Sequence, residues 1–529
     1  MEQNRIMISG LRSAALLLVP AAVVCCSRAK PPGPEPVPVE QADSLSSGPG
    51  GFADGGVAPP PDGRPNVIYI MLDDMAHDMM PGMGRYPFID MPNLLRMQRE
   101  GVTFRNYFAV MSLSAPSRAT NLTGTYPHIN GIMQNLNNVD PDWNVTPTFG
   151  KYLQESGYST AFIGKVHMAS ASAFRGRNHI RPGFDYWVSF YGQGSYENPL
   201  ILDNGLERNV NGYMTDILNN YALNWIKGKR DKNKPFAMCL WHKAVHGPFT
   251  PADRHQNVYN GNTIAAPPWD THLDDLSTKP VWQRAKIKNI HENVPAFITP
   301  SAWTGTRSAQ WGQLRTLKAV DDSLGDILAL LEEEGILDNT VIMFSSDNGY
   351  FHGEHQFGDK RIAYENSIRI PLMVRFPKAI QAGSEINDLC LNIDIAPTIL
   401  DYAGVPTPSQ MQGESMKGLM EGVLQPGWRR SFFYEYYSDD AQANFDGPNL
   451  TAVRTRDYKY VENNYIYQGH QDIYEFYDLT IDPGEMTNRI NDPLYADIIA
   501  DLKRQLGELK VKYAYNPDRY WRRDQMYPQ

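Results

Sequence analysis

The chain has few cysteines, no long apolar run and no excess of basic charge. Its 529 residues include four cysteines, and acidic residues outnumber basic ones to give a formal net charge of −10. So few cysteines exclude a small scaffold held by a dense disulfide framework. The acidic balance argues against a nucleic-acid-binding protein, which usually carries basic charge. With 42% hydrophobic residues, the chain can bury one large core and a smaller attached one by packing alone.

The first residues are typical of an export signal. Two arginines precede a short apolar run at residues 14–24, which is too short to span a bilayer comfortably. We predict a signal peptide over residues 1–29 and a protein exported to the bacterial periplasm, cell surface or extracellular space. Cys25 and Cys26 directly follow the apolar run, so either is a candidate for a lipid anchor, and cleavage near Ala29 without lipidation is the alternative.

The next segments separate a linker from a folded region. Residues 30–64 are rich in Pro, Gly, Ser and Ala, which predicts a flexible linker. Runs typical of buried strands then lie at residues 67–72, 158–163, 236–241 and 341–344. Helical patterns lie at residues 91–101 and 314–331, the second stopped by Gly335. This alternation predicts an α/β domain over residues 65–405, with a large, mostly parallel sheet between helices.

The pattern changes after about residue 405. Predicted strands at residues 432–436, 451–461 and 473–479 precede a predicted helix at residues 495–513. We therefore predict a smaller C-terminal α+β subdomain, residues 406–529, with an antiparallel sheet. Cys239 and Cys390 lie in apolar runs, where we expect them to pack as small hydrophobic residues and not to form a disulfide.

A first candidate motif is the segment Ser114-Ala115-Pro116-Ser117-Arg118. Proline and serine are common in the first turn of a helix, so Ser114 would lie at the positive end of a helix, where anions are stabilised. Arg118 lies one turn further and can reach back as a cation. Taken alone, the segment is equally consistent with a capped helix start and an incidental arginine.

A second candidate group consists of oxygen-bearing side chains. Asp73 and Asp74 follow the first predicted strand, and Asp347 and Asn348 follow the strand at 341–344. Ligands of α/β sheets bind beyond the carboxyl ends of the strands, and several oxygen ligands suit Ca²⁺. Zinc is disfavoured because no cluster of His or Cys accompanies the carboxylates. Singly, a turn or a helix cap would also explain each pair.

The segment that begins at Ser114 resembles the signature of the type I sulfatases, a branch of the alkaline-phosphatase superfamily. A second family signature is similar to residues 157–167, Gly-Tyr-Ser-Thr-Ala-Phe-Ile-Gly-Lys-Val-His. The resemblance covers roughly residues 66–405 and, more loosely, the C-terminal subdomain, and it implies an alkaline-phosphatase-like fold. It also implies that Ser114 is oxidised to formylglycine (3-oxoalanine) by a radical-SAM sulfatase-maturating enzyme. The implied Ca²⁺ ligands are Asp73, Asp74, Ser114, Asp347 and Asn348.

The same resemblance implies roles for charged side chains. The implied catalytic residues are Ser114, Arg118, Lys165, His167, His246 and Lys360. The arginine and the two lysines would hold the sulfate oxygens, His246 with Lys360 would protonate the leaving oxygen, and His167 would act as the base that releases sulfate. His246 lies in a segment similar to the family's His-x-Pro segment, with His242 as a weaker competitor. Lys360 lies in residues 353–371, which resemble the family's sulfate-binding lysine region.

Aromatic and polar residues indicate the substrate class. The stretches at 182–187, 192–196, 346–350 and 434–437 look like the branch that includes N-acetylglucosamine-6-sulfatases and related glycan sulfatases. We therefore expect a sulfuric ester hydrolase that acts on a sulfated sugar or glycan of heparan or mucin type. Gln193, His352 and Arg361 are candidate substrate contacts, although the aromatic rings of these stretches could equally fill the core.

Two alternatives remain open at this point. One is a phosphate or phosphonate ester hydrolase of the same superfamily, because the charges needed to bind sulfate and phosphate overlap. The other is a non-catalytic protein that binds sulfated glycans, if Ser114 is never oxidised. The sequence patterns encode neither the sulfated position nor exo or endo action.

Overall fold

The structure is a computed structural model that describes residues 63–135, 146–168, 183–264, 277–280, 283, 300–437, 449–464 and 473–516. The predicted export signal, Cys25, Cys26 and the predicted linker up to residue 62 lie outside these ranges. Within the ranges, no helix is both long enough and apolar enough to cross a bilayer.

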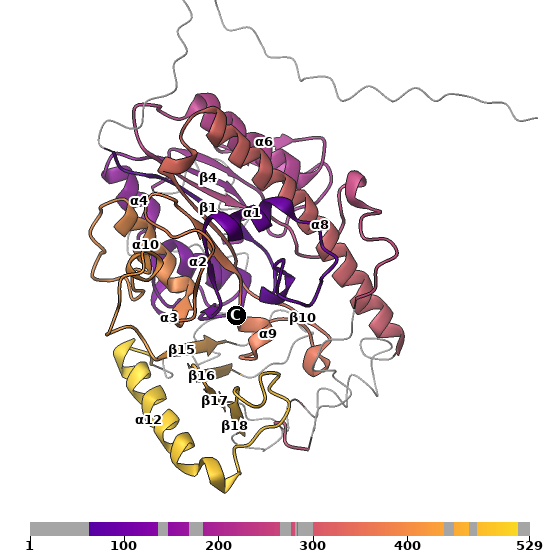
Figure 1. Ribbon diagram of the computed structural model, residues 1–529, viewed down its shortest axis with the longest axis vertical. Coiled ribbons are helices and arrows are strands. Elements are labelled where there is room, and N and C mark those ends of the chain that lie inside the picture. Colours follow the sequence, from indigo (N-terminus) through magenta and orange to yellow (C-terminus); the bar gives the residue numbers. More distant parts are fainter. Residues whose placement is uncertain are drawn as a thin grey trace, which may run out of the picture. The chain divides into compact units, whose positions relative to one another are not determined.

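A ten-stranded sheet forms the centre of the larger part of the fold (Figure 1). Its strands, in spatial order, are β13 (Ser384–Ile386), β2 (Val102–Phe104), β12 (Leu372–Arg375), β9 (Thr340–Ser346), β1 (Asn66–Leu72), β8 (Phe236–Trp241), β4 (Ser159–Gly164), β5 (Tyr186–Ser189), β6 (Leu200–Asp203) and β7 (Leu206–Asn209). The five strands from β9 to β5 run parallel. Antiparallel pairs join β12 to β9 and β2 on one side, and β5 to β6 and β6 to β7 on the other.

Strand β1 shows why the central strands are continuous apolar runs in the sequence. All seven of its residues are buried. Ile68 and Ile70 belong to the core on one face of the sheet, whereas Val67 and Tyr69 belong to the core on the other. Because both faces are covered by helices, alternation between polar and apolar residues is lost. The predicted α/β fold with a mostly parallel sheet is confirmed.

Two groups of helices cover these faces. The longer helices of the first face are α1 (Pro92–Glu100), α6 (Met214–Asn224) and α8 (Pro300–Glu333), and those of the second are α2 (Ser114–Thr123), α4 (Phe149–Glu155) and α10 (Ile395–Tyr402). Helix α8 begins 14 residues before the predicted start at residue 314. Its end agrees with the prediction, since Gly335 adopts a left-handed conformation with φ of 69°.

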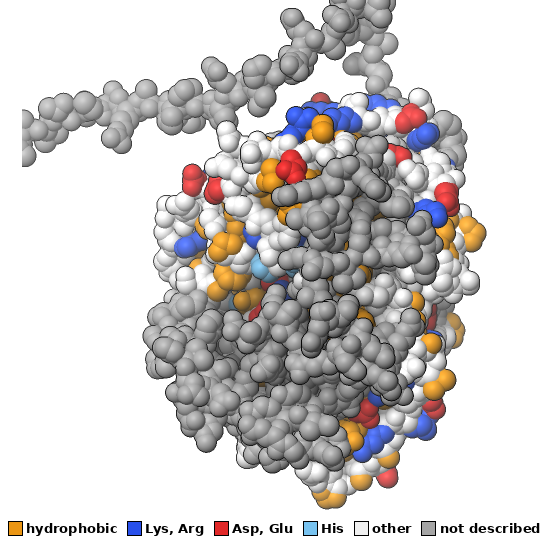
Figure 2. Space-filling model, turned by 180° about the vertical axis from the view of Figure 1, so that it is seen from behind, with side chains coloured by type: hydrophobic (Ala, Val, Ile, Leu, Met, Phe, Trp, Pro, Cys, Tyr) orange, Lys and Arg blue, Asp and Glu red, His pale blue; other side chains and the backbone are white. Residues whose placement is uncertain are grey.

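Short elements fill the loops. They are α3 (Pro127–Asn130), α9 (Glu365–Ile368), α11 (Lys417–Met420), and the two-stranded pairs β3 (Tyr107–Phe108) with β14 (Cys390–Leu391) and β10 (Phe351–His352) with β11 (Gly358–Asp359). Cys239 in β8 and Cys390 in β14 are buried and free, as predicted. On the face shown in Figure 2, basic and acidic side chains are interspersed over the described surface.

The C-terminal region forms an antiparallel sheet with α12 (Ala496–Lys512) packed against it. Its strands are β15 (Ser431–Tyr436), β16 (Asn449–Thr455), β17 (Tyr458–Asn464) and β18 (Ile473–Asp478). The prediction of one strand at 451–461 was wrong, because the chain turns at Arg456 and Asp457. The Thr455 hydroxyl stabilises that turn by accepting hydrogen bonds from the backbone amides of Asp457 and Tyr458 at 3.3 and 3.0 Å. No glycine or proline marks the turn in the sequence.

Candidate active site

Four adjacent strands deliver polar side chains to one edge of the main sheet. Asp73 and Asp74 follow β1, and Asp347 and Asn348 follow β9. The ladder between these strands continues past their ends, since the amide of Asp347 donates to the Leu72 carbonyl at 3.1 Å. Strand β8 leads to His246, and β4 leads to Lys165 and His167. The parallel register therefore brings together residues that lie far apart in the sequence.

Ser114 is the first residue of α2 and is fully buried. Leu113, at the N-cap position, supplies no side-chain hydrogen bond to the helix start. The Ser114 hydroxyl donates to Asp73 Oδ1 at 3.2 Å. The residue thus lies between the positive end of a helix and a carboxylate, as the sequence predicted for its place in the helix.

Arg118, one turn along α2, is fully buried and connects three strand ends. Its Nε and Nη2 atoms lie 3.0 and 2.8 Å from Asp347 Oδ2, and its Nη1 donates to the Lys165 carbonyl at 2.9 Å. Its Nη2 also lies 3.7 Å from Asp73 Oδ1. A guanidinium is suited to this position because it holds several acceptors in one plane.

Lys165 and His167 are joined through Gln193. Lys165 forms a buried ion pair with Asp73, and its Nζ donates to Gln193 Oε1 at 2.6 Å. The Gln193 Nε2 lies 3.3 Å from His167 Nε2. Burial lowers the pKa of Lys165 to about 8 and that of His167 well below its usual value. Burial alone would raise the pKa of Asp73, but Lys165 and other nearby cations hold it well below its usual value.

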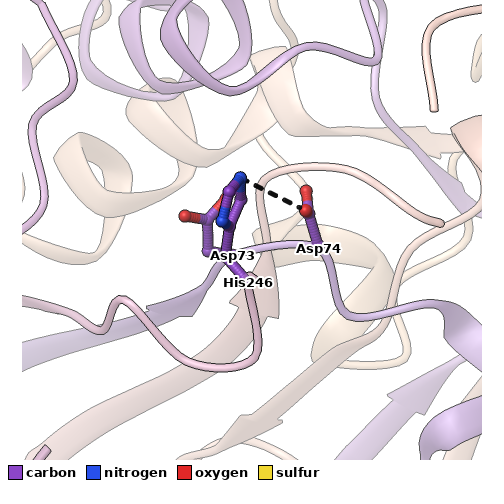
Figure 3. Close-up of side chains that lie close together, drawn as sticks. All are labelled: Asp73, Asp74 and His246. Atoms are coloured by element: carbon purple, nitrogen blue, oxygen red, sulfur yellow. Dashed lines mark ion pairs between the residues drawn. The ribbon is translucent and has the colours of Figure 1, made fainter. Parts of the chain in front are cut away.

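Lys360 and His246 approach the carboxylates from another side. Lys360 forms a buried ion pair with Asp74 and lies 3.7 Å from Asp359. These carboxylates raise the pKa of Lys360, although burial opposes them. His246 points its Nε2 at Asp74 Oδ2 across 3.6 Å (Figure 3), and its Nδ1 lies 3.0 Å from the Gly247 carbonyl. Burial lowers the pKa of His246 to about 3, so the ring is neutral at pH 7 in this arrangement.

The oxygen-bearing residues fit a hard divalent cation. Asn348 Nδ2 donates to Asp74 Oδ1 at 2.7 Å, while Asn348 Oδ1 is buried without a hydrogen-bond partner among the residues described. Burial and neighbouring Asp73 raise the pKa of Asp347 to about 6, and burial also raises the pKa of Asp74. Ligand atoms of Asp73, Asp74 and His246 lie within 4.8 Å of one another. A cation among these groups would relieve the carboxylate repulsion and use the unpaired amide oxygen.

Unusual backbone conformations surround the same groups. Asp74, His167 and Asp359 have φ values of 65°, 57° and 69°, in the left-handed region that non-glycine residues rarely adopt. Such conformations cost free energy and persist where the surrounding structure enforces them, often at functional sites. Asp74 and His167 follow strands of the main sheet, whereas Asp359 lies in β11, 3.7 Å from Lys360.

The three candidate substrate contacts are placed differently. Gln193 lies inside the site, between Lys165 and His167. Arg361 follows Lys360 in the sequence, and its guanidinium pairs with Asp359 at 3.0 Å. His352 is fully buried, its backbone amide donates to Glu354, its ring bonds with Gln313 of α8, and its ring centroid lies 5.1 Å from that of Tyr350.

The competing histidine, His242, is fully buried one residue after β8. Neither of its ring nitrogens has a hydrogen-bond partner in the described part of the chain. Burial lowers the pKa of His242 to about 3, so its ring is neutral. The structure therefore brings His246, and not His242, against Asp74.

Two supporting residues were not foreseen. The Ser117 hydroxyl donates to the Asp347 carbonyl and accepts a hydrogen bond from Asn392 Nδ2 at 2.9 Å. The helix-start pattern does not predict this role for Ser117, which fixes the backbone of the candidate metal ligand Asp347. Asn392 has no motif around it, so no sequence signal could have placed it here.

Comparisons with known proteins agree with this geometry. Residues 65–405 match a family model described as Sulfatase, and residues 353–512 match one described as N-sulphoglucosamine sulphohydrolase, C-terminal. The chain is 35% identical over 513 residues to an N-acetylglucosamine-6-O-sulfatase of Bacteroides thetaiotaomicron, with 86% of this chain and 88% of that protein covered. It is 30% identical over 462 residues to the N-acetylglucosamine-6-sulfatase of Homo sapiens, with 80% and 81% covered.

Solved structures show the same relationship. One is described as a complex with its substrate, D-glucosamine-2-N,6-O-disulfate. It superposes with a TM-score of 0.74 at 33% sequence identity, and the match covers 86% of this chain and 99% of that chain.

Proposed function

The chain belongs to the sulfatase family, and from that premise we propose that it removes 6-O-sulfate groups from glucosamine residues of sulfated glycans. Its reaction class is sulfuric ester hydrolysis. The observation that carries the proposal is the meeting of Ser114, Arg118, Lys165 and Lys360 around buried carboxylates at the ends of adjacent strands. The choice of sugar is supported by relatives named for N-acetylglucosamine 6-sulfate and by the glucosamine disulfate complex.

Members of this family generally use a formylglycine and a divalent metal. We propose that Ser114 is the formylglycine precursor and that the metal is Ca²⁺. Asp73, Asp74, Asp347 and Asn348 would hold the ion through oxygen atoms, in keeping with the unpaired Asn348 Oδ1. When bound, the hydrated aldehyde and the ion together supply an oxygen nucleophile that ionises more easily than a serine hydroxyl.

The positively charged side chains of the site would bind the sulfate. Arg118, Lys165 and Lys360 are buried, and they lie on different sides of the carboxylates. In a water-excluded site, such prearranged positive charges stabilise the negative charge that develops on the sulfate oxygens during transfer. The three cationic side chains balance the charge of the three carboxylates Asp73, Asp74 and Asp347. A bound divalent ion would therefore give the site a net positive charge, which attracts an anion.

Proton transfer falls to the remaining polar groups. Lys360 is protonated at pH 7, because its pKa is raised, and it can donate to the departing alcohol oxygen with His246 beside it. His167 has a lowered pKa and is neutral, which suits the role of base in the release of sulfate. Gln193 keeps Lys165 and His167 in place between these events.

The modification can be tested by mass spectrometry. Trypsin should release residues 106–118, which contain Ser114. After coexpression with a radical-SAM maturating enzyme, we expect this peptide to have lost two hydrogens, whereas protein made without that enzyme should be unmodified and inactive. An unmodified peptide in fully active protein would rule out the formylglycine.

The substrate can be tested by sulfate release from a panel of sugars. We expect N-acetylglucosamine 6-sulfate and N-sulfoglucosamine 6-sulfate to be hydrolysed, and galactose 6-sulfate and 2-O-sulfated sugars to be poor substrates. An aryl phosphate in the same panel tests the phosphate-ester alternative. Faster release from another position or sugar would contradict the proposed specificity.

We also propose that the protein is exported, on the strength of the predicted signal at residues 1–29. Cell fractionation should recover the activity outside the cytoplasm. Removal of residues 1–29 should leave it in the cytoplasm, and activity that stays cytoplasmic for the full chain would contradict the proposal.

A further inference from the structure

A second cationic cavity lies outside the candidate active site. Its volume is about 260 Å³, slightly below the ~300–1,000 Å³ typical of small-molecule sites. Its walls come from the loop after Asp74, from α9 and the residue after it, from the β16–β17 hairpin and from the chain after β18. The lining residues are Ala76, His77, Asp78, Glu365, Asn366, Arg369, Arg454, Arg456, Leu479 and Pro483. None of the six implied catalytic residues is among them.

The charges of the lining do not cancel. Glu365 pairs with Arg454 at 3.2 Å, and Asp78 pairs with Arg85, which lies outside the cavity. These pairs account for both carboxylates of the lining. Arg369 and Arg456 remain, and neither forms an ion pair with a carboxylate of the chain as far as it is described. Over the whole lining, three arginines face two carboxylates, so the cavity carries a net charge of +1.

The two arginines are held differently. Arg369 is fixed by its Nε, which donates to the Arg105 carbonyl at 2.9 Å. Burial and the neighbouring Arg454 and Arg105 lower the pKa of Arg369, although Glu365 opposes this. Arg456 is exposed at the hairpin turn and can adjust to a ligand. The Nε and Nη2 of Arg369 are both held by the Arg105 carbonyl, which leaves its Nη1 for a ligand, whereas the whole guanidinium of Arg456 is free to bind an oxyanion.

An independent observation comes from His77. Its Nε2 is buried without a hydrogen-bond partner within the described ranges, although the residue lines the cavity. Burial, together with Arg369 and Arg105, lowers the pKa of His77 well below its usual value. An unpaired buried nitrogen costs free energy unless a ligand or water satisfies it. Because the neutral ring donates its proton from Nδ1 to the Phe104 carbonyl, Nε2 presents a lone pair to the cavity, which a hydroxyl group of a sugar ring can fill.

We propose that this cavity is an accessory oxyanion site that binds a sulfate or carboxylate group of the glycan chain, away from the sulfate that is hydrolysed. The choice of a glycan as ligand rests on the proposed function. A free sulfate ion has the same chemistry, so the test must separate the chain-borne group from the free ion. Arg456 is the residue to change, because its side chain is exposed and makes no hydrogen bond or ion pair within the described structure.

Binding can be measured without turnover in a Ser114→Ala background. We expect a sulfated glucosamine-containing hexasaccharide to bind roughly three- to tenfold more weakly when Arg456→Glu is added, as the loss and reversal of one exposed charge contact predicts. Arg456→Lys should retain most of the affinity. Arg430→Glu is the matched control, because Arg430 is exposed in the same region and does not line the cavity. It should leave the dissociation constant unchanged.

Two further measurements identify the ligand. N-acetylglucosamine 6-sulfate should bind the Arg456→Glu variant as tightly as its parent, because a monosaccharide cannot fill both sites. Crystals soaked in selenate should show an anomalous peak in the cavity that Arg456→Glu removes. Equal hexasaccharide affinity with and without Arg456→Glu would overturn the proposal, and a selenate peak in that case would mark a site for free sulfate. If the protein released no sulfate, the proposed function would be contradicted, but these binding measurements could still be interpreted.

Discussion

At the level of single residues, Gln193 determines which ring nitrogen of His167 carries the proton. A lysine ammonium can only donate, so Gln193 must present its oxygen to Lys165 and its NH₂ to His167. The His167 Nε2 is therefore an acceptor, and the ring proton lies on Nδ1, which has no hydrogen-bond partner among the described residues. In this tautomer Nε2, to which Gln193 donates, is the atom that would accept a proton in the proposed release of sulfate.

Replacing this amide tests that tautomer. Gln193→Glu would accept hydrogen bonds from both neighbours, move the ring proton to Nε2 and raise the pKa of His167. We expect kcat to fall roughly tenfold or more, because the added carboxylate offsets the positive charge of Lys165 that would stabilise the sulfate oxygens, with a shift of the pH profile. Gln193→Asn is the control, because it keeps the amide but shortens its reach. An unchanged pH profile in Gln193→Glu would show that Gln193 contacts only the substrate.

The carboxylate cluster predicts a large effect of metal removal on stability. Asp73, Asp74 and Asp347 lie together in a buried site, and burial together with the charge of Asp73 raises the pKa of Asp74 and Asp347. A ligand present at a hundred times its dissociation constant adds about 2.7 kcal/mol to the free energy of unfolding. We expect a chelator to lower the thermal midpoint, and Ca²⁺ to restore it better than Mg²⁺.

Asn348→Ala provides the matched variant for this measurement. It removes the unpaired Oδ1 and one hydrogen bond to Asp74. The increase in thermal midpoint on adding Ca²⁺ should therefore be smaller than in the unaltered protein. An equal increase would place the ion elsewhere.

Sequence reasoning identified the residues of the site better than the contacts between them. Apolar runs located the strand ends, so the meeting of Asp73 and Asp347 followed from the rule that parallel strands gather their carboxyl ends, whereas Lys165 was implied only by the resemblance to the sulfatases. The resemblance to the sulfatases, seen in the sequence, is confirmed by the family match. The link from Gln193 to His167 and the bond between Ser117 and Asn392, 275 residues apart, depend on loop packing that no local pattern encodes.

At the level of elements, strand β4 ends in a glycine that the site requires. Gly164 has a φ of 127°, and an added Cβ would lie 1.9 Å from the Trp241 carbonyl oxygen of β8. Close pairing of β4 with β8 at this point positions Lys165 and His167. The spacing between the strands leaves no room for a side chain.

Gly164→Ala should therefore disturb both stability and activity. The backbone conformation alone costs an alanine about 1–3 kcal/mol, and relief of the clash would shift Lys165. Gly507→Ala is the contrasting variant, because its Cβ would meet nothing within 4 Å in the middle of α12. It should stabilise the protein by about 0.5–1 kcal/mol. Thermal unfolding and sulfate release should be measured for both variants, and equal effects of the two substitutions would contradict this expectation.

The elements also show which sequence signals are reliable. Long apolar strands and the end of α8 were predicted correctly because burial on two faces and a left-handed glycine each leave a strong local mark. The β16–β17 hairpin was missed because side-chain and backbone bonds at Thr455 make its turn without glycine or proline. Turns of that kind look like continuous strand when only composition is considered.

At the level of the whole described fold, a buried ionic network joins the C-terminal sheet to the catalytic part. Lys459 of β17 donates to the Ala363 carbonyl at 2.6 Å and pairs with Glu485 and Glu365 at 2.6 and 2.9 Å. Lys459 and Glu485 are each 1% exposed, so their charges are almost fully removed from water. Burial and Glu365 raise the pKa of Glu485, and Lys459 opposes them.

Removing the lysine should weaken the whole assembly. Lys459→Met would leave two facing buried carboxylates with one cation fewer, which typically costs 3–5 kcal/mol. The folded-state pKa of Glu485 would rise further, so the folded protein would take up a proton more readily than the unfolded chain. Stability of the variant should then increase as pH falls toward that pKa, and its deficit in thermal midpoint should be smaller at pH 5 than at pH 8. Adding Glu485→Gln should recover part of the loss at pH 8, whereas Lys227→Met, at an exposed position in the main domain, should change little. A deficit that is independent of pH, or no recovery in the double variant, would show that Lys459 contributes through packing and not through its charge.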